Sequence, residues 1–246
     1  GAQVSNIELP SYHYSLLAMA VWSIYTLDRL MDNYLPNTPE TTRHAFWKRH
    51  ARWGWAGIVL VCIAALAILF YFKPLHLLKG GLMLAVCVGI YLLSKQYQSK
   101  AKQICWWKEV VIALSYVLGI TIAWWSVSNI WSIEMYVFCL YLFLLAFLNL
   151  MVIGRLEKEE GLTLSEKSLV DLLSEKSFNI LITIIVAFSA IVVPFLSLPY
   201  SWDILLAALP WLILFPLFLT KLFLYENLYR YWVDGLLILP LIFLLF

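Results

Sequence analysis

Two carboxylates stand at the end of an apolar stretch, in the sequence TLDRLMD, where Asp28 and Asp32 lie four residues apart with Arg29 between them. In a helix, residues at this spacing are neighbours on one face. Two carboxylates so placed repel each other and are costly near lipid, so a cation between them would stabilise the pair. Magnesium suits such a site, because it takes oxygen ligands and often bridges carboxylates to phosphate. Alternatively, Arg29 and the loop arginines neutralise the pair at a solvated helix end, and the spacing alone leaves both interpretations open.

The chain that must position these carboxylates is strongly hydrophobic. Of its 246 residues, 63% are hydrophobic and 13% are charged, whereas a soluble domain usually carries about 25% charged residues. This composition predicts an all-α, polytopic membrane bundle, with residues 1–246 forming a single transmembrane domain. The net charge of +2 and the lack of an aromatic-basic pattern argue against a nucleic-acid partner.

Eight apolar runs follow one another along the chain, and a spanning helix needs about 20 such residues. We therefore expect about eight transmembrane helices. The runs are Tyr12–Met31, Trp53–Phe72, Leu75–Ser94, Trp107–Val127, Ile133–Ile153, Phe178–Leu198, Trp202–Leu222 and Trp232–Phe246.

The basic residues indicate an orientation. All of the 17 lysines and arginines except Lys73 and Lys79 fall after alternate runs, on one predicted side. This asymmetry predicts an integral membrane protein whose charged side is cytoplasmic. The cytoplasmic loops would be 33–52, 95–108, 154–177 and 221–231. The polar stretch 155–177 repeats the sequence LSEKS and predicts a short amphipathic helix over the charged helix ends.

The stretch from Ile24 to Asp32 resembles the first aspartate-rich motif of the UbiA superfamily of intramembrane prenyltransferases, N-D-x-x-D-x-x-x-D. The last two aspartates of that motif fall on Asp28 and Asp32, and its first two polar positions hold Ile24 and Tyr25. The sequence YLLSK, which contains Tyr91 and Lys95, is similar to the Tyr-x-x-x-Lys element of the family.

A second acidic motif of the family would end the fifth run. Here Asn149 and Ile153 occupy two of its positions, and Glu157 falls at a third. The family has nine transmembrane helices, with the first motif ending the second helix. The resemblance therefore implies a further helix before Gly1.

The resemblance also implies an activity. The chain would be a magnesium-dependent transferase that moves an isoprenyl group from a prenyl diphosphate to a hydrophobic, lipid-soluble acceptor within membrane lipid. The residues implied as catalytic and as magnesium ligands are Asp28, Asp32 and Glu157. The residues implied to bind substrate are Arg43, Tyr91 and Lys95.

Two other classes of function stay open. The first is a non-catalytic subunit that keeps this fold and joins other membrane subunits, which Ile24, Tyr25 and Ile153 would favour because they replace polar ligands. The second is a transporter, for which proline-broken helices and mid-helix charges are expected. Prolines interrupt the later runs only, and the carboxylates lie at helix ends, so the transporter ranks third.

Overall fold

The computed structural model describes residues 10–32, 42–73, 75–101, 107–127, 132–160, 168–196, 200–224 and 228–242. Within these ranges, the side chains at 32, 42–44, 75–76, 94–101, 123–127, 200–202 and 237–242 lie outside the description.

The described residues are helical throughout and include no strand, which confirms the predicted all-α class. The described part of each apolar run coincides, to within one residue, with a helix or with two consecutive helices. The elements are α2 (Ser11–Asp32), α3 (Thr42–Phe72), α4 (Leu75–Ala101), α5 (Lys108–Val127), α6 (Ile133–Glu159), α7 (Leu169–Leu172), α8 (Glu175–Val192), the 3-10 helix η1 (Val193–Leu196), α9 (Tyr200–Phe218), α10 (Thr220–Leu224) and α11 (Leu228–Ile242).

Among the described residues, three segments are long and apolar enough to cross a membrane by length and composition. They are Ala45–Phe72, Ile133–Glu159 and Glu175–Leu196. Leu77–Leu93 and Asp203–Phe218 are shorter apolar segments. The chain therefore has the character of an integral membrane protein, and the number of helices that cross the membrane stays a prediction.

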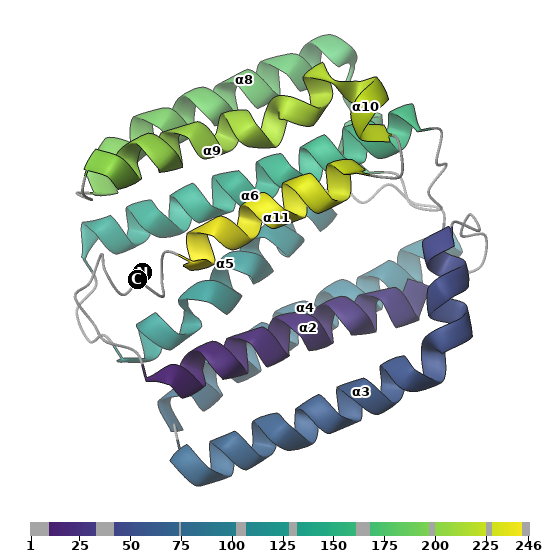
Figure 1. Cartoon of the computed structure of the whole chain (residues 1–246), viewed down its shortest axis with the longest axis vertical. Coiled ribbons are helices and arrows are strands. Elements are labelled where there is room, and N and C mark those ends of the chain that lie inside the picture. The colour runs from purple at the N-terminus through teal and green to yellow at the C-terminus, as the bar shows by residue number, and fades with distance from the viewer. Residues whose placement is uncertain are drawn as a thin grey trace.

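Helix α6 is the centre of the larger core. Tyr141, Leu142, Leu148 and Met151 on this helix are completely buried. Figure 1 shows α8 and α9 on one side of α6, with α11 beside it and α5 beneath. Because α6 packs against α5, α8, α9 and α11, this helix holds the others in place.

A smaller core joins the first helices to α5. Leu84, Val88 and Leu92 of α4 are buried against side chains of α2, such as Leu27, and of α5, such as Leu118. Helix α3 packs against α2 and forms the outer edge at the bottom of Figure 1. Helix α5 is thus the element that connects the two cores.

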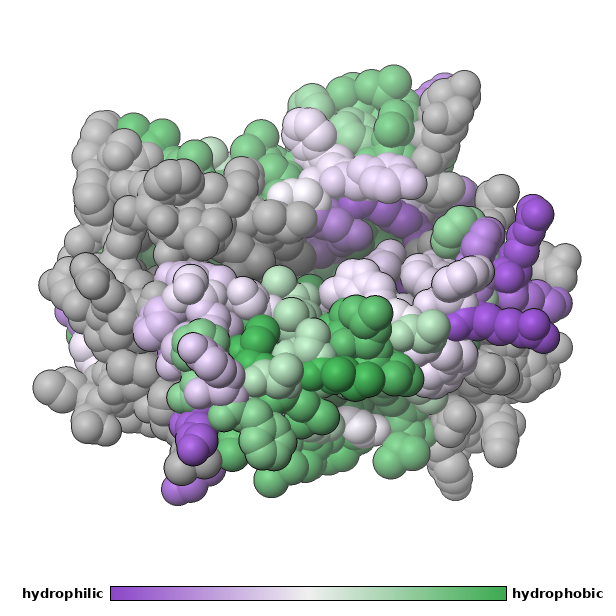
Figure 2. All heavy atoms as spheres, turned by 60° about the horizontal axis from the view of Figure 1, so that its bottom comes forward, coloured by the Kyte–Doolittle hydropathy of each residue, from purple (hydrophilic) through white to green (hydrophobic). Residues whose placement is uncertain are grey.

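The surface is apolar where a membrane helix would meet lipid. Trp53, Leu60, Ile63 and Phe70 on α3 are exposed at 78, 68, 62 and 78%. Figure 2, which brings this side forward, shows hydrophobic side chains over the middle and hydrophilic ones toward the right-hand edge. Lipid would cover such a surface, since water would not solvate it favourably.

The helices alternate in direction, so several of their charged ends meet at one end of the bundle. At the right of Figure 1, α2 and α6 end and α8 and α11 begin. We call this the charged end. Within the polar stretch 155–177, α6 continues to Glu159 and the helical turn α7 follows before α8.

Candidate functional site

Asp28 lies in the last turns of α2, at the charged end. Its Oδ1 accepts a hydrogen bond from the hydroxyl of Tyr91 at 3.3 Å, and its Oδ2 lies 3.9 Å from Nη1 of Arg29. The Asp28 side chain is 19% exposed. The packing of α4 against α2 therefore brings together two residues that the sequence predicted to share a site.

Arg29 is held beside Asp28 by an aromatic ring. Its guanidinium carbon lies 4.8 Å from the centre of the Tyr25 ring, one turn earlier on α2. A guanidinium over an aromatic face is attracted by the ring electrons. Tyr25 occupies a position where the resemblance would place an aspartate, and here the ring positions a positive charge instead.

Glu157 forms the shortest ion pair among the described residues of the charged end. Its Oε1 accepts a hydrogen bond from Nη2 of Arg230 at 2.6 Å, and the two side chains are 14% and 17% exposed. Charge-assisted bonds of this length are stronger than neutral ones, and partial burial limits screening by salt. Helix α11 thus supplies the partner of a residue on α6.

Tyr229 extends this pair into a network. Its completely buried hydroxyl accepts a hydrogen bond from Nε of Arg230 at 3.0 Å and donates one to Oε2 of Glu160 at 3.1 Å. Burial raises the pKa of Tyr229 to about 12, so the hydroxyl keeps its proton at neutral pH. Two carboxylates from the end of α6 therefore hold two neighbouring side chains at the start of α11.

The two sets of contacts are neighbours. Burial alone would lower the pKa of Arg230, but the charge of Glu157 and the hydroxyl of Tyr229 outweigh it and raise the pKa. The charge of Arg29 acts in the opposite direction on Arg230, and Figure 1 shows the end of α2 and the start of α11 at the same end of the bundle. We call Asp28, Arg29, Tyr91, Glu157 and Arg230 the charged cluster.

The predicted site residues divide into two groups. Asp28, Tyr91 and Glu157 belong to the charged cluster. The side chains of Asp32 on α2, Arg43 on α3 and Lys95 on α4 lie outside the described residues, so their predicted roles stay predictions.

Sequence reasoning missed Arg230 and Tyr229 as site residues. Arg230 was explained as one of many basic residues on the charged side, and a tyrosine before an apolar run is typical of an interfacial position. The one local signal is that Arg230 stands between two tyrosines in the sequence LYRYW. Such a pattern does not identify a partner on another helix.

The carboxylates differ in how well they suit magnesium. Asp32 follows Asp28 by one turn of α2, and Asp28 accepts a hydrogen bond from Tyr91 at 3.3 Å and lies 3.9 Å from Arg29. Glu157 is already bound by Arg230 at 2.6 Å. The described side chains contain no group of three histidine, cysteine or acidic residues arranged to hold a metal ion. Glu157 would therefore have to release Arg230 in order to bind a magnesium ion.

The segment before α8 packs onto the charged end. Val170 is 2% exposed and lies over Gly154 of α6. Oε1 of the buried Glu109, in the first turn of α5, accepts a hydrogen bond from the backbone N–H of Leu169 at 3.1 Å. Lys158 donates to the Val170 carbonyl at 3.3 Å. Helix α7 is thereby tied to both α5 and α6.

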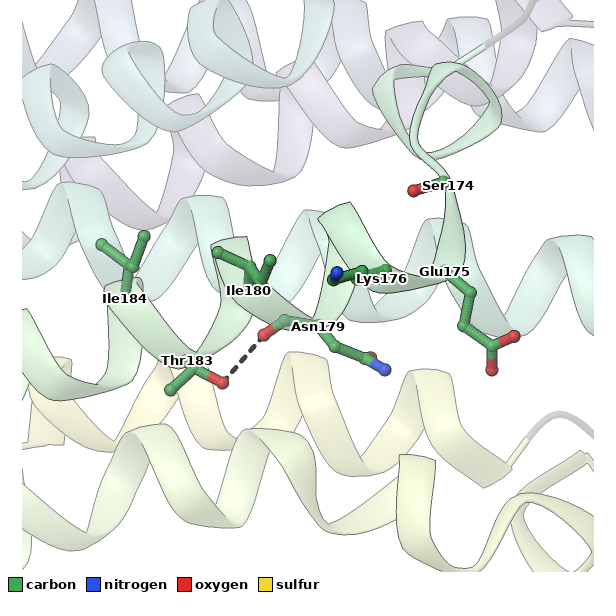
Figure 3. Close-up of a pocket in the computed structure, with 7 residues that line it drawn as sticks. All are labelled: Ser174, Glu175, Lys176, Asn179, Ile180, Thr183 and Ile184. Atoms are coloured by element: carbon green, nitrogen blue, oxygen red, sulfur yellow. Dashed lines mark hydrogen bonds between the residues drawn. The ribbon is translucent and has the colours of Figure 1, made fainter.

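A shallow recess lies on the outer side of α8, away from the charged cluster. Figure 3 shows Glu175, Asn179 and Thr183 directed to one side of the helix, with Ile180 and Ile184 directed to the other side. The hydroxyl of Thr183 donates to the Asn179 carbonyl at 2.8 Å, which is a bond within the helix. The recess contains none of the predicted site residues.

The fold and the charged cluster together describe an apolar bundle of helices that has carboxylates, guanidinium groups and a tyrosine at one end. In comparisons with family models, curated proteins and solved structures, no match to this chain was found. The likeness to the UbiA superfamily therefore depends on the short motifs in the sequence.

Proposed function

We propose that this chain is a UbiA-like integral membrane prenyltransferase, which moves an isoprenyl group from a prenyl diphosphate to a lipid-soluble acceptor. The observation that carries the proposal is the contact between Asp28 and Tyr91 at the charged end of an otherwise apolar bundle. Two residues of separate predicted motifs, 63 positions apart, share one site. The charged end would face the cytoplasm, as the basic residues predict.

The site matches the two chemical properties of such a substrate. A prenyl diphosphate has a long apolar chain and a multiply charged head group. The helical bundle offers apolar surroundings for the chain, and the charged cluster offers polar contacts for the head group. Arg43 and Lys95 would add positive charge at the same end, since both belong to segments that begin or end there.

The reaction requires that the carbon–oxygen bond to the diphosphate breaks and that the diphosphate leaves with the electron pair. An electron-rich atom of the acceptor then forms a bond to the allylic carbon, and the acceptor loses a proton. Magnesium held by Asp28 and Asp32 would neutralise charge on the departing diphosphate. Apolar side chains around the prenyl chain would exclude water, which would otherwise capture the allylic cation.

The first prediction tests this function. Asp28→Asn removes one charge at almost constant volume, so prenyl transfer should fall to background while the amount of folded protein stays near that of the wild type. The measurement is magnesium-dependent transfer from labelled prenyl diphosphates to a mixture of lipid-soluble acceptors, with purified protein in lipid.

The control variant is Glu159→Gln, at the same end of the bundle. Glu159 forms an exposed pair with Arg155 at 2.8 Å, and such pairs contribute only about 0–1 kcal/mol to stability. Its transfer activity should equal that of the wild type. Unchanged transfer by the Asp28→Asn variant would contradict the catalytic role of Asp28.

One observation favours a second candidate, a non-catalytic membrane subunit. Glu157 is engaged by Arg230 within the protein, as expected of a structural ion pair. In that case cells that need the protein should grow normally with Asp28→Asn. Changes in the segment 164–177 should instead weaken binding to other membrane subunits.

A further inference from the structure

The ion pair between Glu157 and Arg230 lies where the acidic motifs would place a metal ligand. Nη2 of Arg230 is 2.6 Å from Oε1 of Glu157, and Nε is bonded to the Tyr229 hydroxyl at 3.0 Å. Tyr229 is itself bonded to Glu160, three residues after Glu157. The guanidinium group of Arg230 is therefore held by two bonds, one to Glu157 and one to Tyr229. For Glu157 to bind a metal ion, it would have to release Arg230 and leave this charge half-buried, which is costly.

Arg230 keeps further hydrogen-bonding capacity. A guanidinium group has more N–H donors than the bonds to Glu157 and Tyr229 use, and the described side chains supply no other acceptor to it. The Arg230 side chain is 17% exposed, so part of its guanidinium group is accessible to a ligand. A planar guanidinium in a fixed orientation suits phosphate oxygens, which it can bind through two parallel bonds.

The charges around Arg230 limit what can bind without a metal. The contacts described above place the carboxylates of Asp28, Glu157 and Glu160 among the guanidinium groups of Arg29 and Arg230. These carboxylates oppose the binding of a diphosphate. A divalent cation at Asp28 would reduce this repulsion and favour binding.

We propose that the guanidinium group of Arg230 occupies, beside Glu157, the place that a metal ion would take. Arg230 then binds the phosphate groups of the substrate, and the site holds a single magnesium ion, at Asp28. Arg230 is then a substrate-binding residue, and Glu157 is a positioning residue that orients it. This inference rests on the proposed function. It differs from the motif-based prediction, in which Glu157 binds the metal ion directly.

The experiment measures binding and not turnover. The probe is inorganic pyrophosphate, titrated calorimetrically with magnesium present into the purified full chain in lipid nanodiscs. Bound metal ions are counted by electron paramagnetic resonance with manganese in place of magnesium. The variants are Glu157→Gln, Arg230→Gln and Arg230→Lys. The matched control is Arg155→Gln, which removes the arginine that pairs with Glu159 on α6 and is 22% exposed.

The proposal predicts opposite effects for the two members of the pair. Arg230→Gln should weaken pyrophosphate binding by about tenfold or more, because a charge-assisted contact is lost. Arg230→Lys should recover only part of it, since an ammonium group lacks the planar fork. Glu157→Gln should leave binding equal or tighter, because a negative charge is removed beside the phosphates. One manganese ion should bind per chain, and Arg155→Gln should behave as the wild type.

Other outcomes separate the two proposals. Loss of pyrophosphate binding in Glu157→Gln, or two manganese ions per wild-type chain, would show that Glu157 is a metal ligand and overturn the inference alone. Tighter pyrophosphate binding in Arg230→Gln would also overturn it, because Arg230 would then only compete with the metal. No pyrophosphate binding by the wild type would overturn the proposed function as well. If Arg230→Gln does not fold, the Glu157→Gln titration and the manganese count still decide.

Discussion

The hydroxyl of Tyr229 shows how one uncharged group can organise charges at a helix end. It accepts a bond from Arg230 and donates one to Glu160, and it is completely buried. Because its pKa is raised to about 12 by burial, it stays a donor at neutral pH. The orientation of Arg230 toward Glu157 therefore depends on a side chain that carries no charge.

A prediction at this scale concerns Tyr229→Phe. The change removes the hydroxyl and leaves Arg230 Nε and Glu160 with one partner fewer, so the protein should lose about 1–3 kcal/mol of stability. Thermal unfolding of the purified protein in detergent would measure the loss. Tyr231→Phe, at a side chain that is 77% exposed, is the control and should have no effect. Equal unfolding temperatures for the two variants would contradict a structural role for the Tyr229 network.

At the scale of the element, small residues decide how closely two helices approach. Gly80 and Gly81 are adjacent on α4 but differ in surroundings. A Cβ at Gly80 would overlap Cγ1 and Cδ1 of Ile122 on α5, whereas a Cβ at Gly81 would have no described atom within 4 Å beyond its chain neighbours and the backbone of its own helix. The absence of a side chain at Gly80 therefore permits the packing of α4 against α5.

This contrast predicts different outcomes for two alanine substitutions. Gly80→Ala should destabilise the protein by about 1–3 kcal/mol, because Ile122 or the backbone must move. Gly81→Ala should be neutral or stabilising by up to about 1 kcal/mol, since alanine favours a helix more than glycine does. Thermal unfolding of both variants in the same detergent is the measurement. A greater loss at Gly81 than at Gly80 would contradict the described contact between α4 and α5.

At the scale of the whole molecule, the charged cluster needs helices from both cores. Asp28 and Tyr91 come from α2 and α4 of the smaller core, and Glu157 and Arg230 come from α6 and α11 of the larger core. A small rotation of one core relative to the other would change the distance between Arg29 and Arg230. The relative position of the two cores, which α5 connects, is therefore part of the geometry of the site.

The orientation in the membrane gives a prediction for the whole chain. With the native cysteines replaced, Lys176→Cys at the charged end should resist a membrane-impermeant maleimide in intact bacterial cells. Ile133→Cys at the opposite end, 70% exposed, should react. The reason is that basic loops remain on the cytoplasmic side. Disruption of the cells should make both positions reactive, and the reverse pattern in intact cells would contradict the predicted orientation.

The helical class of this protein was predictable from the sequence because it depends on local properties. Long apolar runs separated by charged segments favour helices wherever they pack, and the described residues are helical as predicted. The expectation that Asp28 and Tyr91 share one site came from the resemblance to the UbiA motifs, and alternating helix directions agree with it by placing both residues at one end of the bundle. Helix formation and the position of charges at helix ends depend on residues that are close in sequence.

The pairing of Glu157 with Arg230 depended on the tertiary structure. The two residues are 73 positions apart, and the sequence around Arg230 does not distinguish a loop arginine from a partner of Glu157. The packing of α11 against α6 decides it, because the first turn of one helix then meets the last turn of the other. Whether a carboxylate at a helix end faces a metal ion, a guanidinium group or water depends on which helix packs beside it, and that choice depends on side-chain shapes throughout both cores.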